Sequence, residues 1–166
     1  MSDALGLSVA GAVALGCGAT AVTDLWAVLR KRLLGVPPLD YALVGRWVGH
    51  MPRGRFVHSR ISDAEPVRGE GVIGWCVHYL TGIGFAAVLL AWTGPGWLCR
   101  PEFVPAMTVG IASVLAPFLV MQPALGAGFA AARTPHPGRA RLQSLLTHCV
   151  FGIGLYLCGL AISLLC

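Results

Sequence analysis

Four long apolar runs that contain no lysine or arginine most constrain the fold of this 166-residue chain. They cover residues 4–29, 72–92, 103–125 and 142–166. Crossing a bilayer takes about 20 apolar residues, so each run is long enough to span a membrane. Because no water satisfies backbone polar groups inside a bilayer, each run is predicted to be a helix. The sequence therefore predicts an all-α, polytopic membrane protein with four transmembrane helices.

The overall composition agrees with this prediction. Hydrophobic residues make up 56% of the chain and charged residues only 11%, against about 25% charged residues in a soluble domain. We expect a single membrane domain over residues 1–166, with one sizeable cytoplasmic loop at 30–71. The first run is expected to be retained rather than cleaved as a signal peptide, because its basic cluster follows it instead of preceding it.

The basic residues predict the orientation of the chain. Eight of the 12 lie in the loop 30–71 and three in the loop 126–141, which leaves only Arg100 for the opposite side. Loops rich in lysine and arginine stay in the cytoplasm. We therefore expect a multi-pass protein of the bacterial inner membrane with both termini periplasmic. The same rule accounts for the net charge of +5, so no nucleic acid is expected as a partner.

One short pattern occurs twice. His-x-x-x-Gly-Ile-Gly begins at His78 and again at His148, in each case near the start of an apolar run. A histidine inside an apolar run is costly to bury without a partner. The pattern indicates either two repeated helical hairpins or glycines that were placed independently for helix packing.

Each apolar run carries one strongly polar residue near its predicted cytoplasmic end. The four are Asp24, His78, Gln122 and His148. At the rise of an α-helix, both histidines lie about 9 Å below the start of their runs, and Asp24 lies at a similar depth. We predict that the four form one polar layer.

Small or polar residues recur at every fourth position on three of the runs. Such rows are contact faces between membrane helices, so Asp24, His78 and His148 are expected to point into the bundle. The rows are Ser8, Ala12, Gly16, Thr20 and Asp24; Gly74, His78, Gly82 and Ala86; and Ser144, His148, Gly152 and Tyr156.

Three interpretations of the polar layer remain open. The layer could consist of structural hydrogen bonds between helices, in a structural or accessory protein without a ligand. It could bind or transport a small ligand or ion near the cytoplasmic face, since ionisable residues inside membranes mark such sites. His78 and His148 could instead ligate haem or a metal ion. We take binding or transport as the leading hypothesis, with no cofactor required and a homo-oligomer as the expected assembly.

The cytoplasmic loop adds basic residues that could form a rim around such a site. Arg46, His50, Arg53 and Arg55 are the candidates, with His58 and Arg60 nearby. Attraction to anionic lipid headgroups of the bilayer accounts for most of this charge. A small anionic ligand is the alternative, because guanidinium groups suit phosphate and carboxylate.

Other features bear on chemistry and on local structure. No nucleophile–base pattern, phosphate-binding loop or pair of carboxylates occurs, so an enzyme is not expected. Cys99 and Cys166 should lie near the outer face as free thiols, with a disulfide as the alternative. We predict an amphipathic helix over 39–51, a kink near Pro117, and a turn rather than a helix over 126–141.

Four segments resemble a known family. They are residues 18–26, 41–56, 116–123 and 145–152, the second being the most specific. Together they resemble DUF2938, a family of uncharacterised bacterial integral membrane proteins. The resemblance covers nearly the whole chain and implies an inner-membrane protein with four helices. It implies no activity, substrate or catalytic residue.

Overall fold

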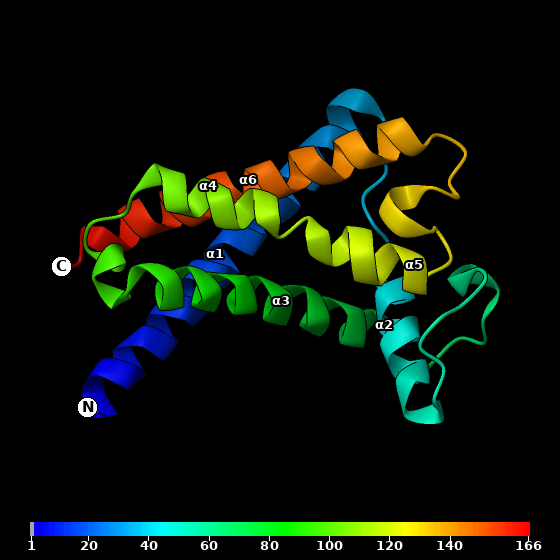
Figure 1. Cartoon of the computed structure of the whole chain (residues 1–166), viewed down its shortest axis with the longest axis horizontal. Coiled ribbons are helices and arrows are strands. Elements are labelled where there is room, and N and C mark those ends of the chain that lie inside the picture. The colour runs from blue at the N-terminus through cyan, green and yellow to red at the C-terminus, as the bar shows by residue number, and fades with distance from the viewer. Residues whose placement is uncertain (1) are drawn as a thin grey trace. The chain divides into compact units, whose positions relative to one another are not determined.

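The chain is all-helical. The computed structural model describes the backbone of residues 2–166 and the side chains of residues 9–166, and no strand occurs in this part. Its helices follow the chain from blue to red in Figure 1: α1 (Ser2–Leu34), α2 (Tyr41–His50), α3 (Glu70–Thr93), α4 (Phe103–Ala112), α5 (Gln122–Ala124) and α6 (Pro137–Ser163).

Among the described residues, four segments are long and apolar enough to cross a membrane, as predicted. They are Val9–Leu34, Glu70–Thr93, Phe103–Ala124 and Pro137–Ser163. Two helices extend beyond the predicted apolar runs. The first helix continues to Leu34, where Gly35 adopts a φ of 64° and its N–H donates to the Lys31 carbonyl, a common way to end a helix. The last helix begins at Pro137 rather than at residue 142, because proline fits the first helical turn.

The α-helix of the third of these segments is interrupted just before Pro117, the residue at which the sequence predicts a kink. The α-helical part α4 ends at Ala112, and a wider π-helical turn over Pro117–Met121 leads into α5. Proline has no N–H to donate to the preceding turn, so a regular α-helix cannot continue through it. A change of helical geometry within a span is therefore encoded by this residue.

The loops contain more helix than the sequence indicated. The helix predicted over 39–51 is present as α2, and the Asp40 side chain caps it by accepting from the Ala42 N–H at 3.0 Å. Residues 126–141 were expected to form only a turn. This prediction was wrong, because the segment includes a 3₁₀ turn at Phe129–Ala131 and the start of α6.

The contacts divide the chain into two compact units. The first unit comprises Met1–Pro37, Tyr79–Ser113 and Leu146–Cys166, and the second comprises Pro38–His78 and Val114–Leu145. Within the first unit, parts of the four long segments pack around one buried core. Its residues are Ala12, Leu15, Ala19, Ala86, Leu89, Leu90, Trp97, Ala106, Val109, Phe151 and Leu155.

Within the second unit, α2 lies directly against the start of α3. A Cβ added to Gly45 would meet the Glu70 carbonyl, and one added to Gly74 would meet the Tyr41 carbonyl. The two backbones are thus as close as glycine allows. This contact brings side chains of the segment between α1 and α3 to the first turns of α3.

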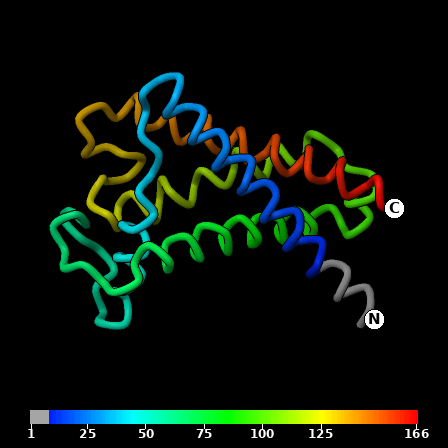
Figure 2. The backbone as a smooth tube through the Cα atoms, turned by 180° about the vertical axis from the view of Figure 1, so that it is seen from behind, coloured from blue at the N-terminus to red at the C-terminus, as the bar shows by residue number. Residues whose placement is uncertain are grey.

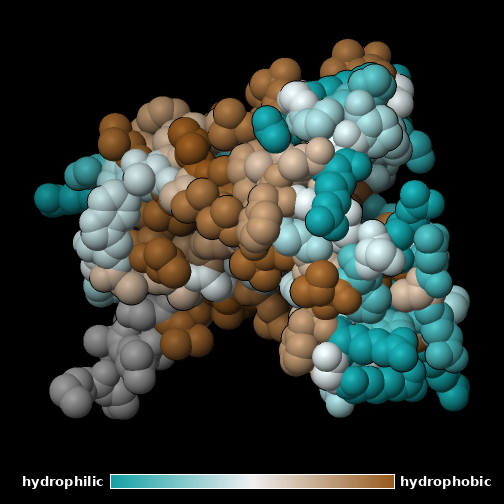
Figure 3. Space-filling model, turned by 45° about the vertical axis from the view of Figure 1, so that its right-hand side comes forward, coloured by the Kyte–Doolittle hydropathy of each residue, from teal (hydrophilic) through white to brown (hydrophobic). Residues whose placement is uncertain are grey.

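Large apolar side chains remain on the surface of the long helices. Leu25, Leu80 and Val104 are each about two-thirds exposed or more (69%, 65% and 71%). Figure 3 shows hydrophobic residues covering much of one face of the molecule. Such surface is expected where lipid rather than water surrounds a helix.

A disulfide joins Cys99 to Cys166. In Figure 2 the C-terminal end lies beside the segment that follows α3, where Cys99 is found. Free thiols were expected at both positions, and that expectation was wrong. The sequence placed the two cysteines at the same end of the helices, but only the fold shows that their Cα atoms are 5.7 Å apart.

Candidate functional site

The closest approach of α1 and α3 lies along the predicted row of small residues. A Cβ on Gly16 would meet the backbone of Ile83, and one on Gly82 would meet the Thr20 hydroxyl. This confirms that the row on α1 is a helix contact face at Gly16 and Thr20. Ser8, which was predicted to begin the row, lies outside the described side chains.

Asp24 ends this row, where it meets Tyr79 of α3. The Tyr79 hydroxyl donates to Asp24 Oδ2 at 3.0 Å. One helical turn away, the Thr20 side chain is 1% exposed, and its hydroxyl has no hydrogen-bond partner. A carboxylate and two hydroxyl groups therefore lie along one interface of the first unit. We call these three residues the α1–α3 oxygen strip.

His148 also lies in the first unit, with a different partner. Its Nδ1 is 2.6 Å from the hydroxyl of Ser113, which is itself 2.6 Å from the Gly110 carbonyl. A hydroxyl has one proton and a carbonyl can only accept, so Ser113 donates to Gly110 and His148 donates to Ser113. The neutral imidazole then keeps its lone pair on Nε2.

The other two predicted polar residues lie in the second unit. His78 Nε2 is 3.0 Å from the Tyr41 hydroxyl, and the two rings stack with centroids 4.2 Å apart. Gln122 donates to the Ser144 hydroxyl at 3.3 Å, while its carbonyl oxygen is buried without a partner. The four residues of the predicted layer thus have four different partners, two in each unit.

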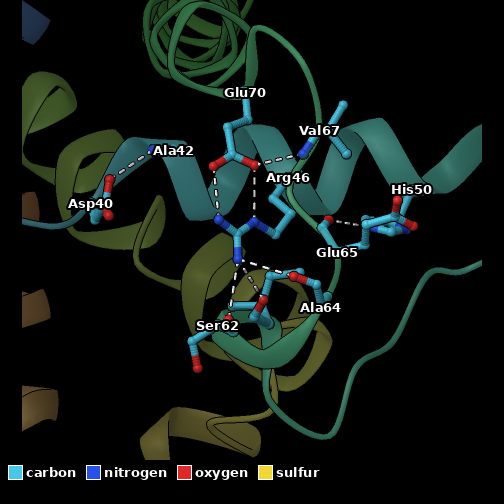
Figure 4. Close-up of polar contacts among 10 residues, drawn as sticks. Asp40, Ala42, Arg46, His50, Ser62, Ala64, Glu65, Val67 and Glu70 are labelled. Atoms are coloured by element: carbon cyan, nitrogen blue, oxygen red, sulfur yellow. Dashed lines mark hydrogen bonds and ion pairs between the residues drawn. The ribbon is translucent and has the colours of Figure 1, made fainter.

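Arg46 is held within the chain rather than presented to a ligand (Figure 4). Its Nε and Nη2 donate to the two carboxylate oxygens of Glu70 at 2.9 and 2.8 Å. Its Nη1 donates to the carbonyls of Ser62 and Ala64, both at 3.2 Å. The hydrogen bond to Glu70 raises the pKa of Arg46 above its usual range. Sequence reasoning missed Glu70, although an acid in the first turn of a helix is a familiar stabilising feature.

The remaining candidates of the rim separate into buried and exposed residues. His50 is 1% exposed, and its Nε2 donates to the Glu65 carbonyl at 2.9 Å. Arg53 and Arg55 are exposed, and Arg53 Nη1 approaches the Glu65 carboxylate only to 4.0 Å. Among the predicted rim residues, therefore, only Arg53 and Arg55 have the exposure that a free anion or a lipid headgroup needs.

Among the described residues, no three histidine, cysteine, aspartate or glutamate side chains come together in a way that could hold a metal ion. Binding of haem by His78 and His148 stays a prediction, and each ring already has one nitrogen engaged by a hydroxyl group.

Comparison with known proteins gives a family but no activity. A family model described as a protein of unknown function (DUF2938) matches residues 13–162. No curated protein matches the chain, and no solved structure matches it.

Proposed function

Because the chain belongs to the DUF2938 family of proteins of unknown function, we propose a function from its own geometry: it binds a monovalent cation at Asp24 within the bacterial inner membrane. The observation that carries this proposal is the hydrogen bond from Tyr79 to Asp24, in a helix that is long and apolar enough to span a membrane. Transport of the bound cation is the activity that such a site would serve.

The charge at Asp24 supports a cation as the ligand. A carboxylate is costly inside a bilayer, and such residues commonly mark paths for ions or protons. One carboxylate carries one negative charge, which a monovalent cation neutralises. The side chains of the α1–α3 oxygen strip offer only oxygen atoms as ligands for a cation. Oxygen ligands suit hard cations.

The orientation that we propose has both termini in the periplasm. The distribution of basic residues supports it, and the bond between Cys99 and Cys166 supports it independently. Disulfides persist in the periplasm and are rare in the cytosol, so the loop with Cys99 and the C-terminal Cys166 belong on the periplasmic side.

A structural or accessory role is the second candidate. It is favoured by the hydrogen bonds that His78, His148 and Gln122 each make within the chain. In that case the polar residues would hold helices together, and no ligand would change the stability of the protein.

Thermal unfolding of the purified protein in detergent distinguishes the two candidates. Sodium or potassium chloride should raise the melting temperature relative to an equal concentration of choline chloride. A ligand at 100 times its Kd stabilises the native state by about 2.7 kcal/mol. The shift should disappear in Asp24→Asn and persist in the control Asp63→Asn, whose carboxylate lies in an exposed part of the cytoplasmic loop.

Two outcomes would contradict cation binding at Asp24, and a third would establish haem binding. An Asp24→Asn protein that is stabilised as strongly as the wild type would contradict the proposal. So would a wild-type protein whose stability responds to neither cation, and that result would favour the accessory role. A visible absorption band in the purified protein, lost in His148→Ala, would establish haem binding instead.

A further inference from the structure

Two histidines of the second unit come together although they are separated in the sequence by a turn and a loop. His50 is the last residue of α2, and the ring of His58 lies against it with centroids 5.3 Å apart at an angle of 69°. We call this contact the histidine pair. It belongs to the cytoplasmic loop and shares no residue with the α1–α3 oxygen strip.

The hydrogen bond of His50 fixes which nitrogen carries its proton. The Glu65 carbonyl can only accept, so the neutral imidazole has its N–H at Nε2 and its lone pair at Nδ1. That Nδ1 is buried and has no hydrogen-bond partner. Histidines that bind metals typically donate their second ring N–H to a carbonyl or carboxylate in this way.

His58 supplies further unpartnered nitrogen atoms. Both of its ring nitrogens are buried without a hydrogen-bond partner, so the two rings touch but do not satisfy each other. Burying unpaired polar atoms costs free energy, and each such group calls for an explanation. A ligand that accepts imidazole lone pairs would satisfy Nδ1 of His50 and the lone-pair nitrogen of His58, and so would remove part of this cost.

The backbone around His58 is held in place. The His58 N–H donates to the Ala124 carbonyl at 2.9 Å, and the Ile61 N–H donates to the Leu125 carbonyl at 3.2 Å. Gly126 lies so close that a Cβ would meet the Ser59 carbonyl. The backbone that carries His58 is therefore fixed against α5 and the residues that follow it.

We propose that the histidine pair binds a divalent transition-metal ion of the kind that imidazole prefers, such as Zn²⁺, Ni²⁺ or Cu²⁺. Two imidazoles bound to one Zn²⁺ at a tetrahedral angle have ring centroids about 5 Å apart. The observed separation of 5.3 Å fits this geometry. His58 is half-buried as a whole residue, so the pair lies near the surface of the loop, and we take water as the further ligand of the ion.

Calorimetric titration of the purified full-length protein with zinc chloride tests this proposal, with nickel chloride as a second probe. The purification tag is removed and the free thiols are alkylated, so that only the chain's own histidines and carboxylates are measured. The wild type should bind one ion per chain. His58→Ala keeps the bond between His50 and Glu65 and should bind tenfold more weakly or worse. His136→Ala, which removes an exposed histidine in the other cytoplasmic loop, should bind like the wild type.

Two results would overturn the proposal. One is a wild-type protein that binds neither ion, which would make the histidine pair a packing contact only. The other is an equal affinity of His58→Ala and the wild type. Far-UV circular dichroism shows whether His58→Ala and His136→Ala keep the helix content of the wild type.

Discussion

At the scale of single residues, the arginine side chains of the segment between α1 and α3 differ in whether the chain itself provides a partner. Arg46 pairs with Glu70 and with loop carbonyls, and its side chain is 13% exposed. Arg53 and Arg55 lie at the surface. Arginine thus stabilises the fold at position 46 and provides surface charge at positions 53 and 55.

Replacing Arg46 with lysine should destabilise the protein. Lysine keeps the charge but cannot reach both oxygens of Glu70 and the carbonyls at once. Hydrogen bonds to charged groups are worth about 1.5–3 kcal/mol, so we expect a loss of about 2 kcal/mol and a lower melting temperature in detergent. The control Arg55→Lys should melt like the wild type. Equal melting temperatures for the two variants would contradict the role given to Arg46.

The sequence allowed part of this residue-level description. It indicated that Asp24, His78, Gln122 and His148 are polar residues at similar depth, and the structure gives a hydrogen bond to each. It could not identify their partners, because the rotation of each helix about its own axis determines which side chains meet. The partners are Tyr79, Tyr41, Ser144 and Ser113. The sequence also could not show that Glu70 lies beside Arg46, so the sequence analysis grouped Arg46 with the exposed arginines.

At the scale of helices, glycine spacing determines which faces meet. The two copies of His-x-x-x-Gly-Ile-Gly have different surroundings. In the first copy, Gly82 packs on Thr20 of α1 while Gly84 has open space around it. In the second copy, Gly152 packs on Met107 of α4 and Gly154 packs on Ala19 of α1. The sequence predicted that these rows are contact faces, but not which helix each glycine would contact.

Gly82 and Gly84 make a matched pair of tests. Gly82→Ala would place a methyl group against the Thr20 hydroxyl, and overpacking typically costs about 1–3 kcal/mol. Gly84→Ala meets no atom within 4 Å and should be neutral or slightly stabilising, since alanine favours the helix. Melting curves in the same detergent provide the comparison. If Gly84→Ala were the more harmful change, the described contact between α1 and α3 would be wrong.

At the scale of the whole molecule, the disulfide ties the C-terminus to the loop after α3. It closes a sequence separation of 67 residues, and native disulfides typically contribute about 2–4 kcal/mol. The sequence predicted both cysteines near the outer face, but it could not show that they meet. That depends on where α6 ends relative to the loop that contains Cys99.

Counting thiols tests both the bond and the proposed orientation. Protein alkylated under denaturing conditions should gain four alkyl groups, on Cys17, Cys76, Cys149 and Cys158, and six after reduction. Protein from cells that lack the periplasmic thiol-oxidising enzyme should gain six without reduction. Full oxidation in those cells would argue against a periplasmic location, and six reactive thiols in normal cells would argue against the bond itself.

The most direct test of the central claim is equilibrium binding of a radioactive cation to the purified protein. The isotope used is that of sodium or potassium, whichever stabilises the wild type more. We predict one cation bound per wild-type chain, one per Asp63→Asn chain and none per Asp24→Asn chain. An Asp24→Asn protein that binds one cation per chain with the wild-type Kd would contradict the assignment of Asp24 as the cation site.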